Sequence, residues 1–392
     1  MPPVARFLRH ARSAFGWIAL AASVAVAGPL LAVDHVAIRR AEEAEETRLS
    51  GRVVVEAVDK SLLFQTADGG LYAITAEQVV HRDSDPQPFE PVSADDLGKQ
   101  LLATLPAGFD VHRTRNYVFA YNSNKAYVQW VGALFERLHR GFHTFWQGKG
   151  IKLSEPEFPL CVLVFADDES YSSYVKQHYG EAASKLAAFY ALSTNYVTLY
   201  DLTGVGALRR EGSRRGNSGQ INEMLSHPSA SQNVATVVHE AFHQLQFNCG
   251  LSQRYADVPL WVAEGLAMYF ETPDLKSAQG WRTIGAVHHG RLRDFRGYLP
   301  NRPEASLKSL VVDDKRFRDA RGAIAAYGEA WAMNHFLMQR HTKEYAAYLK
   351  VVAAKPPAVV QTPEDRLKEF TAAFGELEAL DAEFLKHVQA LR

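Results

Sequence analysis

Hydrophobic and polar positions near the start of the chain alternate with a period of two. The runs GRVVVEA, SLLFQT and GLYAIT show this alternation, and Asp68-Gly69 lies between the last two as a hairpin turn signal. The pattern predicts a small β module over residues 48–82. Because so short a segment is marginally stable alone, we expect the module to pack on the main domain. The proline-rich and acidic composition of residues 83–109 favours a linker.

From residue 110 onward, apolar runs typical of buried strands alternate with segments whose apolar residues have helical spacing. The predicted elements are strand 116–121, helix 125–147, strand 159–166, helix 169–179 and strand 188–202. Residues 110–392 are therefore expected to form an α+β domain, in which a mixed sheet leads into helices and residues 315–392 form a helical C-terminal region. Residues 203–230 interrupt the pattern as a long loop, either a solvated insertion or a rim over a site.

Residues 1–33 differ from the rest of the chain. A basic stretch without acidic residues precedes an uncharged apolar run over residues 14–33, which is typical of an export signal. Ala25-Val26-Ala27 is an acceptable cleavage site and favours a cleaved signal peptide, whereas the length of the run also suffices for a retained N-terminal membrane anchor. Either alternative predicts an exported protein, periplasmic or extracellular, with the anchor tethering it to the inner membrane.

Overall charge narrows the range of partners. Lys and Arg total 43 against 44 Asp and Glu, so no global field favours nucleic acid or an anionic membrane surface. The oxidation state of the two cysteines depends on the compartment in which the protein resides. After export, Cys161 and Cys249 either form a disulfide or stay as free buried thiols.

The segment VVHEAFHQLQ, residues 237–246, lies within a helical hydrophobic pattern. Four residues on a helix offset His239 and His243 by only about 40°, so both imidazoles can bind one tetrahedral ion. Glu240 is turned about 100° away from His239, which lets it hold a water molecule beside the ion instead of binding the ion itself.

The segment DVPLWVAEGLAMYFE, residues 257–271, predicts a second helix. Glu264 is an acid near the middle of this apolar segment, and burying its carboxylate would be costly without a cation. Glu271 returns to nearly the same face and is a candidate acceptor for the other N–H of a ligand histidine. His239, His243 and Glu264 therefore predict one Zn²⁺ bound within residues 231–271 of each chain.

At these motifs the sequence resembles the gluzincins, zinc peptidases in which a glutamate from a following helix joins two motif histidines. WVAEGLAMYFE is similar to the W-x-x-E-G…Y-x-E segment of the aminopeptidase N and leukotriene-hydrolase type. The likeness is greater to an uncharacterised bacterial family of peptidase-MA-like proteins, in which HEAFHQLQFN, PLWVAEGLAMYFE and AYGEAWAMNHFL occur in this order. The resemblance covers roughly residues 110–390 and implies a zincin-like catalytic domain over 110–392.

That resemblance implies an exported zinc metallopeptidase acting on a peptide or protein substrate. His243 and Glu264 are farther apart in sequence than in aminopeptidase N, and no G-A-M-E-N-type segment is present, so a specificity for free amino termini is not implied. The chemistry of the residues agrees, because three protein ligands leave a position for water, whose proton Glu240 would take. A non-catalytic envelope binding or scaffold protein, and a zinc hydrolase of a non-peptide substrate, are the alternatives.

Further residues complete the predicted site. Tyr327 is the candidate donor to the oxyanion, with a packing tyrosine whose hydroxyl lies at the surface as the alternative. The strand STNYVTLY is predicted to form the upper edge of the cleft, where Asn195, Tyr196 and Val197 would contact the substrate backbone.

The remaining histidine pairs are assigned no role. His288 and His289 lack a partner at suitable spacing and are predicted to lie in a solvated loop. His139 and His143 lack a following glutamate and are predicted to be surface or packing residues of an aromatic helix.

Overall fold

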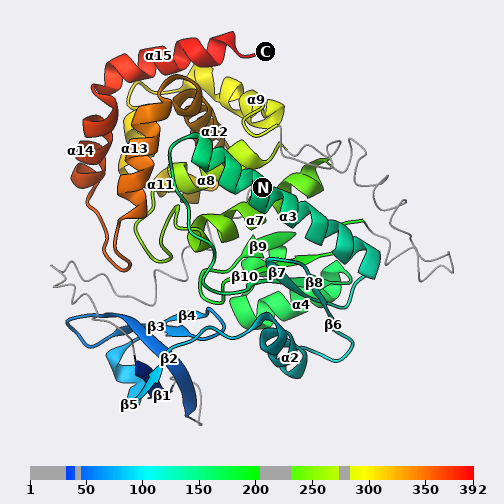
Figure 1. The fold of residues 1–392 in the computed structure, drawn as a ribbon. Coiled ribbons are helices and arrows are strands. Elements are labelled where there is room, and N and C mark those ends of the chain that lie inside the picture. The colour runs from blue at the N-terminus through cyan, green and yellow to red at the C-terminus, as the bar shows by residue number, and fades with distance from the viewer. Residues whose placement is uncertain (1–31, 40–45, 204–230, 273–282) are drawn as a thin grey trace.

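The computed structural model describes residues 32–39, 46–203, 231–272 and 283–392 (Figure 1). The predicted signal or anchor over 1–33 lies outside the described residues, except that β1 starts at Ala32. The predicted loop 203–230 also lies outside them, except for Thr203. Among the helices of the described residues, none has the length and apolar character needed to cross a membrane.

The N-terminal module is a five-stranded antiparallel sheet with the order β4-β3-β2-β1-β5. Its strands are β1 (Ala32–Ile38), β2 (Thr47–Glu56), β3 (Leu62–Thr66), β4 (Leu71–Ile74) and β5 (Val79–Pro88), with a 3-10 turn η2 (Ala76–Gln78) before β5. The three predicted strands are confirmed as β2, β3 and β4. The module extends past both predicted ends, because β1 and β5 flank the predicted range.

The prediction of a linker over residues 83–109 is wrong for most of its length. Its first residues belong to β5, and helix α2 (Ala94–Thr104) follows, capped by Ser93, whose hydroxyl accepts from the Asp96 N–H. Almost every position of β5 is exposed or half-buried, so the strand carries no alternating signal. Its backbone pairing with β1, which composition does not reveal, makes it a strand.

Contacts between the module and the main domain confirm the expected packing. Gly69 has a positive φ of 87° in the predicted turn, and its carbonyl accepts from Arg254 Nη2 at 2.8 Å. One residue past the turn, Leu71 N–H donates to the Ser193 carbonyl at 2.6 Å. The turn between β3 and β4 therefore docks on the main domain, at the segments that contain Ser193 and Arg254.

The main domain has a mixed five-stranded sheet with the order β6-β7-β8-β10-β9. Its strands are β6 (Asp110–Arg113), β7 (Tyr117–Tyr121), β8 (Leu160–Phe165), β9 (Ala188–Tyr190) and β10 (Tyr196–Tyr200). The three central strands are parallel, and the two edge strands are antiparallel to their neighbours. Helices α3 (Lys125–Gly148) and α7 (Ser231–Asn248) cover one face, and α2 and α4 (Asp168–Tyr179) cover the other (Figure 1). The α+β class is thus confirmed.

The last predicted strand, 188–202, is two strands. A turn that contains Asn195 at φ 68° separates β9 from β10, and the 3-10 turn η3 (Ala183–Lys185) precedes β9. The expectation that STNYVTLY lies at an edge is wrong, because β10 pairs with β8 on one side and with β9 on the other. The short strand β9 is the edge.

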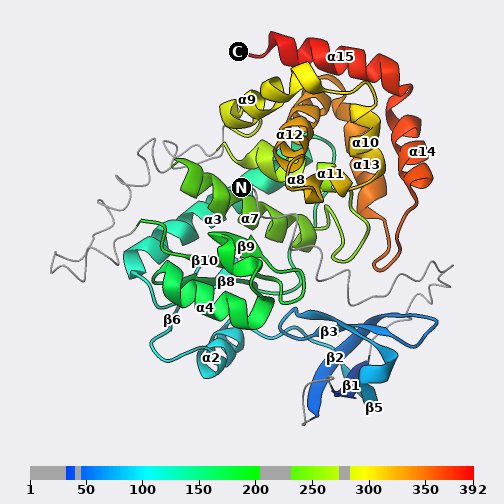
Figure 2. The ribbon, with the colours of Figure 1, turned by 180° about the vertical axis from the view of Figure 1, so that it is seen from behind.

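The C-terminal part is helical (Figures 1 and 2). Its helices are α8 (Leu260–Phe270), α9 (His289–Tyr298), α10 (Ser306–Val312), α11 (Lys315–Arg318), α12 (Ala323–Arg340), α13 (Thr342–Ala353), α14 (Pro363–Phe374) and α15 (Leu377–Ala390), with η5 (Leu299–Asn301) after α9. Helices α8 and α12 approach closely at Gly265. A Cβ there would lie 2.0 Å from Asn334 Nδ2 and 2.8 Å from the Ala330 carbonyl oxygen.

The disulfide alternative does not hold, because both cysteines are free and buried. Side chains alternate between the two faces of a strand. Cys161 on β8 packs with Leu163 and Phe165 in the core beneath α2 and α4, whereas Cys249 packs in the core on the other face. The sheet itself separates the two thiols.

Candidate metal centre

Helix α7 carries both motif histidines and is fixed to the sheet. Gln244 Nε2 donates to the carbonyl oxygens of Cys161 and Asn195 at 2.9 Å each, which ties the helix to β8 and to the turn before β10. His239 and His243 are only 5% and 6% exposed. Gly250 follows the end of α7 with φ 82°, a left-handed conformation that glycine adopts at helix ends.

Helix α8 carries Glu264, which is 2% exposed. The start of α8 is fixed by Asp314, whose Oδ1 accepts from the Leu260 N–H at 3.0 Å. Arg366 in turn donates to Asp314 Oδ1 at 3.0 Å and to Asp257 Oδ1 at 2.7 Å. A buried ion network therefore sets the position of the helix that presents Glu264.

The donor atoms of His239, His243 and Glu264 converge, and all lie within 4.8 Å of one another. The two Nε2 atoms are 3.1 Å apart, Glu264 Oε2 is 3.2 Å from His239 Nε2, and Glu264 Oε1 is 3.6 Å from His243 Nε2. Zn–N bonds of about 2.0–2.1 Å in a tetrahedral centre require nitrogens about 3.3–3.4 Å apart. These separations fit a zinc-sized ion, and we call the three residues the α7–α8 centre.

Hydrogen bonds on the far side of each ring leave Nε2 free to act as a donor to a metal. His239 Nδ1–H donates to Glu271 Oε1 at 2.5 Å, and His243 Nδ1–H donates to Gln246 Oε1 at 3.3 Å. With the ring proton on Nδ1, the buried Glu264 Oε2 faces a bare nitrogen and has no hydrogen-bond donor in the described part of the chain. A cation between the three side chains satisfies all of these atoms.

His288 belongs to this network, so its prediction as a solvated loop residue is wrong. Its side chain is only 16% exposed. Nδ1 accepts from the Arg291 N–H at the start of α9, so Nε2 carries the proton that it donates to Glu271 Oε2 at 3.0 Å. Glu271 thus links His239 to His288. No spacing in the sequence indicates this contact, because His288 comes from a different segment from the two helices.

Glu240 lies beside the centre without joining it. It is 3% exposed, and its Oε2 accepts from the Tyr190 N–H of edge strand β9 at 2.8 Å. Burial raises the pKa of the Glu240 carboxyl to about 7, because the charged form loses its hydration. The backbone of β9 holds one carboxylate oxygen and leaves the other without that restraint.

The electrostatics of the α7–α8 centre favour a positive charge. Burial lowers the pKa of His243 to about 4. Burial also opposes a charged His239, yet the neighbouring carboxylates of Glu264 and Glu271 raise the pKa of His239 well above its ordinary value. Two buried carboxylates beside two imidazoles therefore attract either a proton or a metal cation.

The three residues predicted to bind substrate all have internal partners. Asn195 pairs its side chain with Asn248, Tyr196 donates to Asp68 Oδ2 at 3.4 Å, and Val197 is fully buried. They fix the turn before β10 and the docking of the N-terminal module, so they do not line the centre. A strand in the middle of the sheet has no free backbone edge to offer a substrate.

Tyr327 lies on α12 and is 1% exposed, so the alternative of a hydroxyl at the surface is wrong. Its ring contacts Phe317 with centroids 5.2 Å apart, and the Arg291 guanidinium lies 5.7 Å from the ring centroid. Burial alone would raise the pKa of Glu271, but the hydrogen bonds from His239 and His288, and to a smaller extent the charge of Arg291, lower it below its ordinary value. Tyr327 thus lies next to Arg291, whose charge acts on Glu271 beside the α7–α8 centre. The role of Tyr327 as an oxyanion donor stays a prediction.

A comparison with known protein families gives a match in the part of the chain that contains the α7–α8 centre. Residues 233–359 match a family described as protein of unknown function (DUF1570). The matched range includes all three residues of the α7–α8 centre, together with Glu271, His288 and Tyr327. No curated protein matches the chain.

Proposed function

We propose that the chain is an exported zinc-dependent metallopeptidase of the gluzincin kind. The observation that carries the proposal is the convergence of His239, His243 and Glu264 with Glu240 held beside them. The site pairs a buried ligand set for a cation with a buried carboxylate that is not a ligand. This combination is suited to the hydrolysis of an unactivated amide.

His239, His243 and Glu264 would hold the zinc ion. Zinc, when bound, supplies a Lewis acid that lowers the pKa of water and polarises a carbonyl. Glu240 then acts through Oε1, because Tyr190 N–H occupies Oε2. Its carboxylate takes a proton from water and passes it to the leaving amine, a role for which a pKa near neutrality is suited.

The surrounding residues keep this geometry. Glu271 fixes the ring of His239, and Gln246 fixes the ring of His243. Substrate that reaches Glu240 passes the outer edge of β9, because this strand contacts Glu240 through Tyr190. We therefore transfer the predicted backbone contacts with an extended peptide from β10 to β9.

The test compares the purified wild type with Glu240→Gln on a mixed peptide library, with cleavage sites identified by mass spectrometry. The variant should retain zinc and fold but lose hydrolysis, since an amide cannot accept the proton. Glu169→Gln, on the far helix α4, is the control. Cleavage by the variant at the rate of the wild type would place the base elsewhere. Absence of cleavage by the wild type would favour the scaffold or non-peptide alternative.

A further inference from the structure

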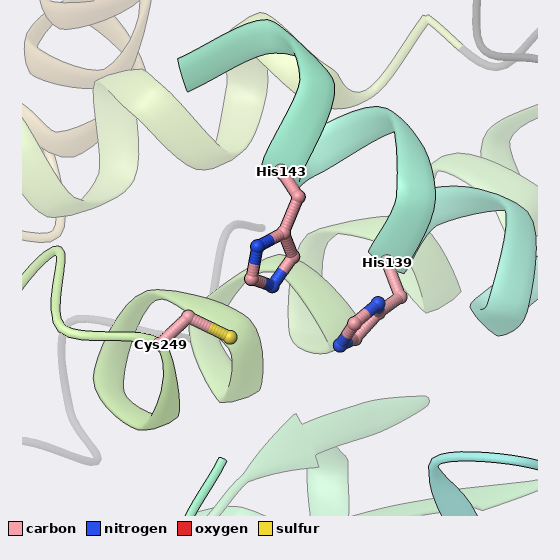
Figure 3. A group of neighbouring side chains, drawn as sticks. All are labelled: His139, His143 and Cys249. Atoms are coloured by element: carbon pink, nitrogen blue, oxygen red, sulfur yellow. The ribbon is translucent and has the colours of Figure 1, made fainter. Parts of the chain in front are cut away.

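A second group of metal-ligand side chains lies outside the α7–α8 centre. His139 and His143 are one turn apart on α3, and Cys249 follows the last turn of α7 (Figure 3). The three side chains point toward one another, and their donor atoms lie within 4.8 Å of one another. The prediction that both histidines are surface or packing residues therefore misses their convergence on a thiol.

The three side chains have buried donor atoms, and both imidazole Nε2 nitrogens lack a hydrogen-bond partner within the described residues. Cys249 is 0% exposed and His139 is 6% exposed. Nε2 of each histidine is shielded from solvent and has no hydrogen-bond partner within the described ranges. A buried ring nitrogen that neither donates nor accepts is costly, so two of them aimed at one buried thiol point to a missing ligand.

A fourth donor is within reach. The Glu155 carboxylate lies 3.8 Å from His139 Nε2, and its charge acts on the Cys249 thiol. Its neighbour Ser154 donates its N–H to the Cys249 carbonyl at 3.0 Å, which ties this segment to the end of α7. Glu155 has a side chain that is 77% exposed, so it can move onto an ion without breaking a buried contact.

We propose that His139, His143 and Cys249, completed by Glu155, form a second site for a zinc-class transition metal. Imidazole and thiolate donors suit Zn²⁺, whereas Ca²⁺ and Mg²⁺ take oxygen ligands. Four protein ligands make a closed site, which is typical of structural zinc. Burial raises the pKa of the Cys249 thiol to about 12, so metal binding must release the thiol proton to solvent.

The two sites are separate. Cys249 is six positions after His243, which corresponds to about 9 Å along the axis of α7. The second site would join α3, the segment at Glu155 and the end of α7. A metal ion there would hold the far end of the helix that carries the α7–α8 centre. The proposal of a second site depends on geometry alone and not on the proposed function.

Cobalt substitution tests this proposal independently of catalysis. The full chain is stripped with a chelator and titrated with Co²⁺, and thiolate-to-cobalt charge-transfer absorption is recorded. The α7–α8 centre contains no sulfur, so only the second site can produce this band. Wild type, Glu264→Gln and the buried-cysteine control Cys161→Ala should all show it, whereas Cys249→Ala should lose it and keep one equivalent of metal.

The outcomes separate the two proposals. A wild type without the thiolate band at excess cobalt, or a Cys249→Ala variant that keeps it, overturns the second site. If Cys249→Ala does not fold, His143→Ala serves instead, because this half-buried residue is removed at lower cost, and it should weaken the band. A Glu264→Gln variant that keeps the band but loses the other equivalent supports both sites, whatever the peptidase assay shows.

Discussion

His239 Nδ1 donates to Glu271 Oε1 at 2.5 Å across 32 residues of sequence. The contact joins the middle of α7 to the residue that ends α8, so it fixes the ring of one proposed metal ligand from the helix that carries another. Glu271 receives a second hydrogen bond from His288. The carboxylate therefore orients a ligand while its own position is set by α9.

Removal of this carboxylate should weaken metal binding without unfolding the chain. Glu271→Ala is expected to lower zinc affinity about 10–100-fold, as is typical for partners of ligand histidines. Competition with a chromophoric chelator measures the zinc affinity. The measurement is made in a Cys249→Ala background, where only the α7–α8 centre is expected to bind zinc. Glu169→Ala is the surface control. An unchanged affinity would mean that Glu271 does not support His239.

Arg366 is expected to be a major contributor to stability. Arg366→Met removes the guanidinium that the buried carboxylates of Asp257 and Asp314 share, which should lower the free energy of unfolding by about 3–5 kcal/mol. Urea denaturation measures the change, and the exposed Arg140→Met should stay within about 0.5 kcal/mol of the wild type. A loss no larger than that of the control would show that the network is dispensable.

The contact between α12 and α15 should make stability depend on pH. Burial lowers the pKa of His335 to about 4, and His387, at 3.0 Å, and Tyr269 face the ring. The unfolded chain binds the proton more readily, so this contribution is complete above about pH 6.5 and is lost as the pH falls toward about 4.

Thermal unfolding across this range tests the assignment. His335→Gln should lose less stability than the wild type between pH 6.5 and pH 4, whereas the exposed control His178→Gln should follow the wild type. Parallel curves for His335→Gln and the wild type would exclude His335 as the source.

Tyr327→Phe tests the predicted oxyanion donor. One such donor typically contributes about 10²–10³-fold to turnover with little effect on ground-state binding. The variant should therefore have a kcat lower by that order, with KM and zinc content unchanged. Tyr174→Phe removes the hydroxyl of a half-buried tyrosine on α4, at the far face of the sheet, and should leave kcat unaltered. An undiminished kcat in Tyr327→Phe would reduce this tyrosine to a packing residue.

Local periodicity was sufficient to place His239 and His243 together, whereas Glu264 was joined to them by the cost of its burial and by the resemblance to the gluzincins. Helical spacing places His239 and His243 on one side of α7, and the cost of burying Glu264 indicates a cation before any contact is known. Spacing of seven residues likewise brings Glu271 back to the face of Glu264. These predictions depend on one helix at a time.

What could not be predicted depends on pairing between distant segments. Strand β5 is defined by β1 and not by its own composition, and the break between β9 and β10 lies within a continuous apolar run. His288 reaches Glu271 from α9, and Cys249 reaches His143 from another helix. Their partners are set by tertiary packing, which a linear pattern does not record.

The close approach of α8 and α12 at Gly265 shows that the neighbouring residues Glu264 and Gly265 have different roles. A methyl group at residue 265 would collide with Asn334, whose Nδ2 donates to the Trp261 and Ala330 carbonyls, so any side chain there would push α8 outward and withdraw Glu264 from the histidines. The glycine acts as a spacer between helices, and the glutamate is the proposed ligand. A relative that kept Gly265 but replaced Glu264 would preserve the architecture without the chemistry, so the glycine alone is a marker of fold and not of activity.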